Sequence, residues 1–84
     1  MLTLTLTLTL TLFHTDGCHL CEQAWALVEQ AGLAGRTRRC DILDDADWLE
    51  AYRVRIPVVR DEAGRELGWP FTLAELQAWL AARE

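Results

Sequence analysis

The chain has no lysine, and its 84 residues include only two prolines, three cysteines and one methionine. Eight arginines stand against thirteen Asp and Glu residues, so the formal net charge is -5. This balance argues against binding to nucleic acid or to an anionic membrane surface, because both require clustered Lys and Arg. The nearest approach to a basic run is Arg36, Arg38 and Arg39, which Thr37 interrupts and which is typical of a solvated edge.

Three cysteines are too few for the disulfide framework of a small secreted fold, and an odd number leaves one unpaired. Cys18 and Cys21 are close together, whereas Cys40 stands apart and is best explained as a small core residue. No signal peptide is evident, because no Lys or Arg precedes Arg36, and no apolar run is long enough to span a membrane. We therefore expect a reducing, cytoplasmic location.

The length suits one domain, residues 1–84. Residues 2–13 alternate between Leu and Thr before ending in Phe13, and this period of two is typical of a β-strand. A strand of that whole length would extend about 40 Å, which is too long for a domain whose expected radius of gyration is about 12 Å. We expect the last part of the repeat to form the strand, and residues 1–6 to be a frayed, low-complexity extension.

The remaining patterns alternate between helix and strand. A polar turn at residues 14–17 precedes a helix that should end at Gly32. The expected apolar face of this helix consists of Leu20, Ala24, Leu27, Val28 and Ala31. Further along, the patterns predict a strand at 36–42, a helix at 44–54, a hairpin of strands at 55–61 and 65–69, and a helix at 72–83. This order predicts an α/β fold with a four-stranded mixed sheet and helices on both faces.

Local signals define the later elements. Asp44 or Asp45 is expected to cap the second helix, and Thr72 with Glu75 forms a capping box for the last one. The side chains expected to face inward from these two helices are Trp48, Leu49, Tyr52, Leu73, Leu76 and Leu80. In the strand at 36–42, Cys40 should point away from Arg39, because side chains alternate along a strand.

Cys18 and Cys21 lie where the first loop becomes a helix. Residues three apart on a helix have Cβ atoms roughly 5 to 6 Å apart, and small adjustments bring them to the roughly 3.5 to 4.5 Å that a disulfide requires. Cys18 would lie at the helix amino terminus, where partial positive charge favours a thiolate. We therefore predict that Cys18 attacks and that Cys21 resolves the mixed disulfide. A charged His19 would assist, whereas Asp16 would act in the opposite direction.

Other interpretations of the pair stay open. The cysteines could be inert, or joined in an adventitious disulfide, within a non-enzymatic adaptor. A zinc site usually needs two more ligands, which no second cysteine pair supplies, and His14 is best explained as an ordinary strand-end histidine. We expect no metal site in a single chain, although Cys18 and Cys21 could bind a metal or cluster in a dimer.

Pro57 lies within the predicted strand at 55–61, where it removes a backbone donor. A strand start or a sheet edge would accommodate it. A cis Ile56–Pro57 bond would turn the backbone of Ile56 toward the sulfurs, so that its N–H and C=O could pair with an extended substrate.

Residues 10–21, "LTLFHTDGCHLC", and residues 55–59, "RIPVV", resemble the thioredoxin superfamily and, within it, a small bacterial branch of glutaredoxin-like proteins. The resemblance implies a thioredoxin-like βαβαββα fold and a thiol–disulfide oxidoreductase or dithiol electron carrier in redox homeostasis. It also implies that Cys18 is nucleophilic, that Cys21 is resolving and that Pro57 is cis beside them. The candidate substrate-binding residues are Gly17, His19, Ile56, Pro57, Gly68 and Trp69.

Two departures from the glutaredoxin pattern weaken the expectation that glutathione binds. Thr15 and Asp16 stand where glutaredoxins commonly have a Lys, and Gly68 is the only glycine where they often have a Gly-Gly turn. Glutathione therefore stays an alternative, and we expect no other cofactor besides the Cys18–Cys21 disulfide. The expected partner is a protein or low-molecular-weight thiol or disulfide, with no nucleic acid and no membrane, and the chain is expected to be a monomer.

Overall fold

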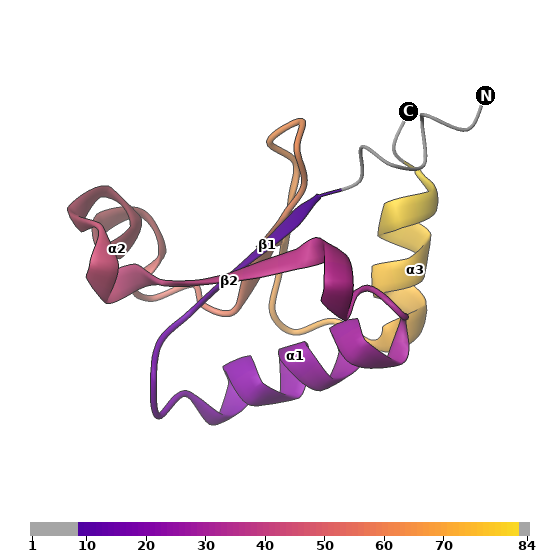
Figure 1. The fold of residues 1–84 in the computed structure, drawn as a ribbon, viewed down its shortest axis with the longest axis horizontal. Helices are drawn as coiled ribbons and strands as arrows, with labels where there is room; N and C mark the ends of the chain where they lie inside the picture. The colour runs from indigo at the N-terminus through magenta and orange to yellow at the C-terminus, as the bar shows by residue number, and fades with distance from the viewer. Residues whose placement is uncertain (1–8, 83–84) are drawn as a thin grey trace.

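The computed structural model describes residues 9–82, which form a four-stranded sheet with three α-helices and two short 3-10 turns (Figure 1). The elements in chain order are β1 (Leu10–His14), α1 (His19–Gln30), η2 (Ala34–Arg36), β2 (Thr37–Asp41), η3 (Ile42–Asp44), α2 (Ala46–Tyr52), β3 (Val58–Arg60), β4 (Glu66–Gly68) and α3 (Leu73–Ala81). The predicted order of strands and helices is confirmed. The expected extension at residues 1–6 lies outside the described residues.

The sheet has the strand order β2-β1-β3-β4. β1 pairs in parallel with β2, with Phe13 opposite Cys40, and α1 makes the crossover between them. β3 runs antiparallel to β1, with Phe13 opposite Val58, and β4 completes the hairpin with Gly68 opposite Val58. The sheet is therefore mixed, as predicted. The carboxyl end of β1 and the amino end of β3 meet at one edge, and this is where the Cys-x-x-Cys loop begins.

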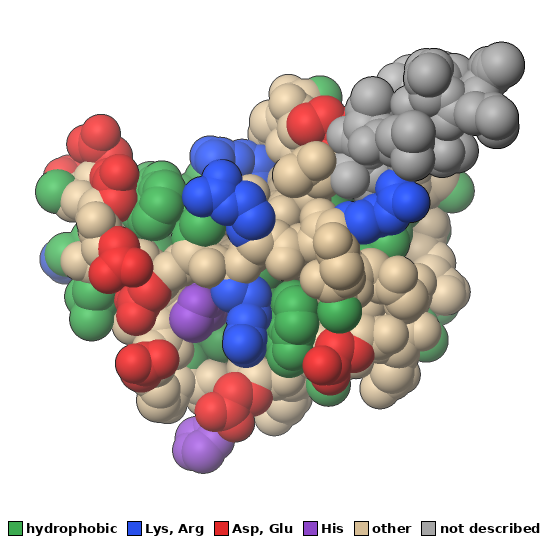
Figure 2. Space-filling model, viewed as in Figure 1, with side chains coloured by type: hydrophobic (Ala, Val, Ile, Leu, Met, Phe, Trp, Pro, Cys, Tyr) green, Lys and Arg blue, Asp and Glu red, His purple; other side chains and the backbone are tan. Residues whose placement is uncertain are grey.

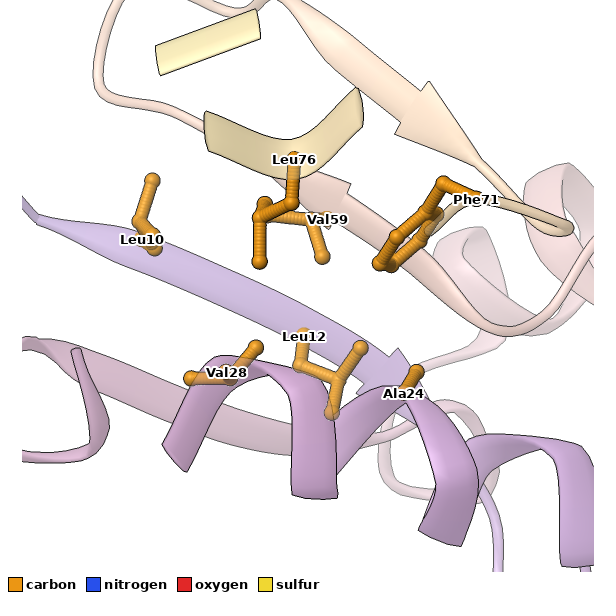
Figure 3. Close-up of a cluster of buried hydrophobic side chains, with 7 residues drawn as sticks. All are labelled: Leu10, Leu12, Ala24, Val28, Val59, Phe71 and Leu76. Carbon is orange, nitrogen blue, oxygen red and sulfur yellow. The ribbon is translucent and has the colours of Figure 1, made fainter. Parts of the chain in front are cut away.

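One face of the sheet is covered by α1 and α3. Seven buried side chains form this part of the core (Figure 3): Leu10, Leu12, Ala24, Val28, Val59, Phe71 and Leu76. Leu10 and Leu12 point to the same face because side chains alternate along a strand, so the predicted period of two places the Leu side chains inside. Burying each of these leucines stabilises the fold by roughly 1.5 to 3 kcal/mol.

The opposite face is covered by α2, which lies apart from α1 and α3 in Figure 1. Phe13 is fully buried there and stacks on Tyr52, with 4.2 Å between ring centroids. Cys40 is buried beside them as a free cysteine and belongs to the same cluster, as its alternation with Arg39 predicts. The helices therefore lie on both faces of the sheet, as predicted.

The helix ends follow their sequence signals. Asp45 caps α2 by accepting hydrogen bonds from the backbone N–H groups of Asp47 and Trp48. Thr72 and Glu75 form the predicted capping box of α3. Gly32 follows α1 with φ = +77°, a left-handed conformation that glycine adopts without strain. Within residues 9–82, no helix is both long enough and apolar enough to cross a membrane.

Two details differ from the sequence prediction. Leu20 was expected on the apolar face of α1, but its exposed fraction is 46% and Cys21 takes the inward position. The buried residues of α1 are Cys21, Ala24 and Val28, so the inward face of the helix runs through Cys21, and Leu20 lies to one side of it. Pro57 lies just before β3, because this strand begins at Val58. At a strand start, the N–H that proline lacks is not needed for a hydrogen bond to the neighbouring strand.

Candidate active site

The loop between β1 and α1 is a tight turn that delivers Cys18 to the helix. The N–H of Cys18 donates to the carbonyl of Thr15 at 3.3 Å, and Gly17 has φ = +83° at the third position of this turn. Side chains other than hydrogen are strained at that φ, so glycine is the residue that the turn requires. The turn therefore positions the first cysteine at the edge of the sheet where β1 ends.

Cys18 is the N-cap of α1, and it forms a disulfide with Cys21, the two Cα atoms being 5.2 Å apart. The backbone N–H of Cys21 donates to Sγ of Cys18 at 3.1 Å. Cys18 is half-buried, whereas the exposed fraction of Cys21 is 4%. The two sulfurs are therefore inequivalent, with the outer one at the positive end of a helix and the inner one against the core.

A cleft of about 350 Å³ opens beside the disulfide. Its lining residues are Leu12, His14, Thr15, Asp16, Gly17, Cys18, Cys21, Glu22 and Arg39. They come from β1, the turn, the first part of α1 and β2. The cleft therefore gathers both cysteines with Gly17, one of the candidate substrate-binding residues.

The carboxylate of Asp41 holds the turn beside the cleft in place through hydrogen bonds. Asp41 accepts a hydrogen bond from the N–H of Leu43 at 2.9 Å and another from the hydroxyl of Thr15 at 3.0 Å. The Leu43 bond is the largest influence on the pKa of Asp41 and lowers it; burial, the second, raises it, and the Thr15 bond and the nearby His14 lower it further, so the net effect is a lowered pKa. Asp41 therefore stays ionised and ties the turn to the end of β2.

His19 lies outside the cleft, between the cysteines, with its side chain 90% exposed. Its Nδ1 atom is 4.0 Å from Oε1 of Glu22 on the next turn of the helix. His19 therefore faces solvent at the start of the helix.

The other candidates gather at the start of the hairpin. The Ile56–Pro57 bond is cis, Pro57 is buried, and its carbonyl accepts from the N–H of Trp69 at 3.1 Å. By the strand register, Pro57 lies one residue beyond the Phe13–Val58 pair, at the same sheet edge as the Cys18 loop. None of these hairpin residues lines the cleft beside the disulfide.

The backbone of Ile56 is only partly available to a substrate. Its N–H donates to the carbonyl of Tyr52 at 3.0 Å, so the expectation that both the N–H and the C=O of Ile56 would pair with a substrate is wrong for the N–H. The chain leaves α2 through a tight turn, and this turn uses the Ile56 donor. An extended substrate could use the carbonyl alone.

Gly68 is the last residue of β4, and Trp69 follows it. Trp69 is half-buried and packs against the α1–α3 core, with its ring edge-on to Phe71 at 5.1 Å between centroids. Gly68 is exposed at the end of β4. Packing therefore accounts for much of the Trp69 ring, and a role in binding rests on the part that stays exposed.

No group of three or more His, Cys, Asp or Glu side chains within residues 9–82 is arranged to hold a metal ion. His14 lines the cleft, yet sequence reasoning treated it as an ordinary strand-end residue. Arg39 also lines the cleft, and sequence reasoning placed it only on a solvated edge. The alternation of Arg39 with Cys40 indicates only that the two side chains lie on opposite faces of the sheet. The pairing of Arg39 with Leu12, which brings it to the cleft, is set by the register of the folded sheet.

The sequence was compared with known protein families. Residues 9–81 match the family model described as Glutaredoxin-like domain (DUF836). The chain belongs to this glutaredoxin-like family. The matched range includes the Cys18–Cys21 turn, the cis-Pro57 segment and all three helices, so the family pattern covers the whole candidate site. A redox role for the cysteine pair fits this membership. No curated protein matches the chain significantly.

Solved structures of similar proteins share the fold. The X-ray structure of Northeast Structural Genomics target protein XcR50 from X. campestris is 49% identical, with a TM-score of 0.83, over 90% of this chain and 100% of that one. Its solution structure gives a TM-score of 0.79 at 49% identity, over 90% of this chain and 96% of that one. The solution structure of Ne2328 from Nitrosomonas europaea, 23% identical, has a TM-score of 0.66 over 87% of this chain and 91% of that chain, and supports the fold alone. The glutaredoxin-like, thioredoxin-like fold is thus confirmed.

Proposed function

We propose that this glutaredoxin-like protein is a thiol–disulfide oxidoreductase, or dithiol electron carrier, that acts through Cys18 and Cys21. The observation that carries the proposal is the asymmetry of the pair. Cys18 is half-exposed at the amino terminus of α1 and accepts a backbone hydrogen bond on its sulfur, whereas Cys21 is buried one turn inside. A backbone N–H aimed at sulfur stabilises a thiolate more than a thiol, because the thiolate is the stronger acceptor.

The reaction proceeds in two exchanges. In the reduced protein, the Cys18 thiolate attacks one sulfur of a substrate disulfide, forms a mixed disulfide and releases the first substrate thiolate. The thiolate of Cys21, formed as its proton leaves, then attacks Sγ of Cys18, forms the intramolecular disulfide and releases the second substrate thiolate. The substrate gains two electrons and the released thiolates take up protons from water. A thiol reductant must reverse the sequence to regenerate the dithiol.

The substrate is a protein or low-molecular-weight disulfide, approached from the exposed side of Cys18. Gly17 and His19 precede and follow Cys18 in the chain, while Ile56, Pro57, Gly68 and Trp69 belong to the hairpin segment at the same end of the sheet. Glutathione is one candidate thiol, although Thr15 and Asp16 replace the basic residue that glutaredoxins commonly carry before the first cysteine. A monomer in the reducing cytoplasm is the expected setting.

Reduction of 2-hydroxyethyl disulfide and of insulin by the wild type, Cys18→Ser and Cys21→Ser tests the proposal. Cys18→Ser should abolish turnover of both substrates. Cys21→Ser should stop at a mixed disulfide of Cys18, seen as the added mass of one substrate thiol. Cys40→Ser serves as the control for loss of a thiol away from the cleft. Turnover that survives Cys18→Ser, or a wild type that reduces neither substrate, would count against the proposal and favour a non-enzymatic adaptor.

A further inference from the structure

Two residues with basic side chains line the cleft, Arg39 and His14. Arg39 lies in β2 opposite Leu12 of β1, on the side of the sheet that α1 covers. Its guanidinium carbon lies over the ring of Trp25 in α1, 4.5 Å from the centroid. On the face shown in Figure 2, arginine side chains lie along β2, and acidic side chains gather around the lower edge and over α2.

The guanidinium of Arg39 has no carboxylate partner among residues 9–82. Two other arginines are used inside the fold, because Arg55 pairs with Glu66 at 2.6 Å and Arg65 pairs with Asp61 at 2.8 Å. Stacking on an indole ring uses the face of the guanidinium and leaves its edge N–H donors available. Arg39 is therefore held in place beside the disulfide, in a net acidic chain, with its donors open to a ligand.

We propose that Arg39 binds a carboxylate of a small disulfide substrate, so that the cleft selects acidic low-molecular-weight disulfides over neutral ones. A guanidinium presents two parallel N–H groups that match the two oxygens of a carboxylate, and an ordered guanidinium loses less entropy on binding. The cleft volume of about 350 Å³ suits a small molecule. This inference names the substrate class for the proposed oxidoreductase and rests on that function, except in the alkylation test below.

Asp16 and Glu22 also line the cleft and act against an anionic ligand. Both are exposed, and Glu22 has its side chain 73% exposed and oriented near His19. Arg39 is exposed as well, so screening over about 8 Å at physiological ionic strength weakens all three charges. A ligand carboxylate in direct contact with the guanidinium is attracted more strongly than it is repelled by carboxylates that it does not touch. Removing the Glu22 charge should therefore strengthen the preference for an anion.

Alkylation of Cys18 in the reduced protein tests Arg39 without any enzymatic turnover. Iodoacetate is an anion and iodoacetamide is its neutral analogue, and both attack the same thiolate. The ratio of their rates therefore cancels any change in the amount of thiolate. Arg39→Gln should lower the iodoacetate-to-iodoacetamide ratio about fivefold, which corresponds to the upper end of the range for an exposed ion pair. Glu22→Gln should raise the ratio.

The matched control is Arg38→Gln, which removes the same charge from the neighbouring position of β2. Arg38 alternates to the other face of the sheet, with Cys40, and does not line the cleft. Its ratio should equal that of the wild type. Arg39→Lys keeps the charge without the planar fork, so an intermediate ratio is expected. If Arg39→Gln does not give the wild-type circular dichroism spectrum, the alkylation ratio of Arg39→Lys tests the role of Arg39 in its place.

A second arm uses two disulfides, 3,3′-dithiodipropionate with two carboxylates and the neutral 2-hydroxyethyl disulfide. Arg39→Gln should lower the ratio of kcat/KM for the acidic over the neutral disulfide about fivefold, mainly through KM. Equal ratios in Arg39→Gln, Arg38→Gln and wild type, in both arms, would overturn the assignment of Arg39. If the wild type reduces neither disulfide, the oxidoreductase proposal fails, while the alkylation ratio still decides whether Arg39 attracts a carboxylate.

Discussion

The backbone N–H of Cys21 points at Sγ of Cys18 and donates a hydrogen bond to it over 3.1 Å. Cys18 is the N-cap of α1, and the first N–H groups of a helix have no partner within the helix. A side chain that accepts from them at the N-cap stabilises the helix, and oxygen acceptors do so by roughly 1 kcal/mol. Here the acceptor is the sulfur of a disulfide, so the same contact that begins the helix also acts on the sulfur that we propose attacks the substrate.

The first prediction concerns the order in which the two thiols react. In the reduced protein at pH 7, iodoacetamide should modify Cys18 about tenfold faster than Cys21, because Cys18 is the exposed sulfur at the helix amino terminus. Quenched time points followed by peptide mass spectrometry measure both rates. Faster labelling of Cys21 would show that Cys18 is not the attacking cysteine.

The second prediction concerns the turn before Cys18. Gly17→Ala should lower the free energy of unfolding by roughly 1 to 2 kcal/mol, because an alanine at φ = +83° is strained even though nothing lies within 4 Å of its new Cβ. Urea denaturation measures the change. Gly35→Ala is the control, since that glycine also has open space around a new Cβ and does not have a positive φ. An equal loss in both variants would rule out backbone strain as the cause.

The third prediction concerns acid stability. Asp61 is 5% exposed and accepts hydrogen bonds from Ala63 N–H, Arg65 N–H and Arg65 Nε. Burial alone would raise its pKa, but the side-chain bond from Arg65 and the two backbone bonds outweigh it and lower the pKa below 3.8. The folded state therefore favours the carboxylate. Its stabilisation is complete above pH 3.8 and is lost as the pH falls through the lowered pKa.

Asp61→Asn should therefore lower stability at pH 7 by about 2 kcal/mol and should flatten the loss of stability below pH 4. Urea midpoints between pH 2 and 7 measure both effects. Glu50→Gln, an exposed change on α2, controls for the loss of one negative charge. Parallel curves for wild type and Asp61→Asn would show that the Asp61–Arg65 contact does not govern the acid limb.

The fourth prediction separates the ring of Tyr52 from its hydroxyl. The hydroxyl donates to Oε2 of Glu66 at 2.6 Å and accepts from Arg60 at 3.2 Å, while the ring stacks on Phe13. Burial and the contact with Glu66 raise the pKa of Tyr52, so the hydroxyl stays protonated and donates at neutral pH.

Tyr52→Phe should cost about 1 kcal/mol of stability because it removes these bonds and keeps the stack, whereas Tyr52→Ala should cost about 3 to 5 kcal/mol. Thermal or urea unfolding of the two variants gives the comparison. If the two losses are the same, the Phe13 stack does not support the α2 face of the sheet.

The fold could be predicted from the sequence because its signals are local and agree with one another. The Leu–Thr alternation predicts a strand, and the Thr72–Glu75 box defines the start of α3. The exact inward face of α1 was harder to predict: Leu20 is apolar, yet it is exposed, and Cys21 takes the inward position in the same turn. The apolar pattern fits either residue, and only the packing of the helix against the sheet decides between them.

The candidate site was predictable only in part, for a similar reason. Cys18 and Cys21 are neighbours in sequence, so their geometry follows from the helix start. Arg39 reaches the same cleft through the β1–β2 register, which no local pattern specifies. The donor of Ile56 is used by Tyr52, four residues earlier, and this depends on how the chain leaves α2. The Arg39 contact joins distant segments, and the Ile56 bond depends on the backbone path of one turn; the sequence pattern specifies neither.

The depth difference between the two sulfurs has a consequence under oxidative stress. A peroxide would meet the outer sulfur first and convert it to a sulfenic acid, while the inner thiol, at 4% exposure, is shielded from the same attack. Condensation of that sulfenic acid with the adjacent thiol expels water and restores the ordinary disulfide. This route would keep the outer sulfur from the irreversible sulfinic and sulfonic acids, because the product is a disulfide that thiol–disulfide exchange can reduce.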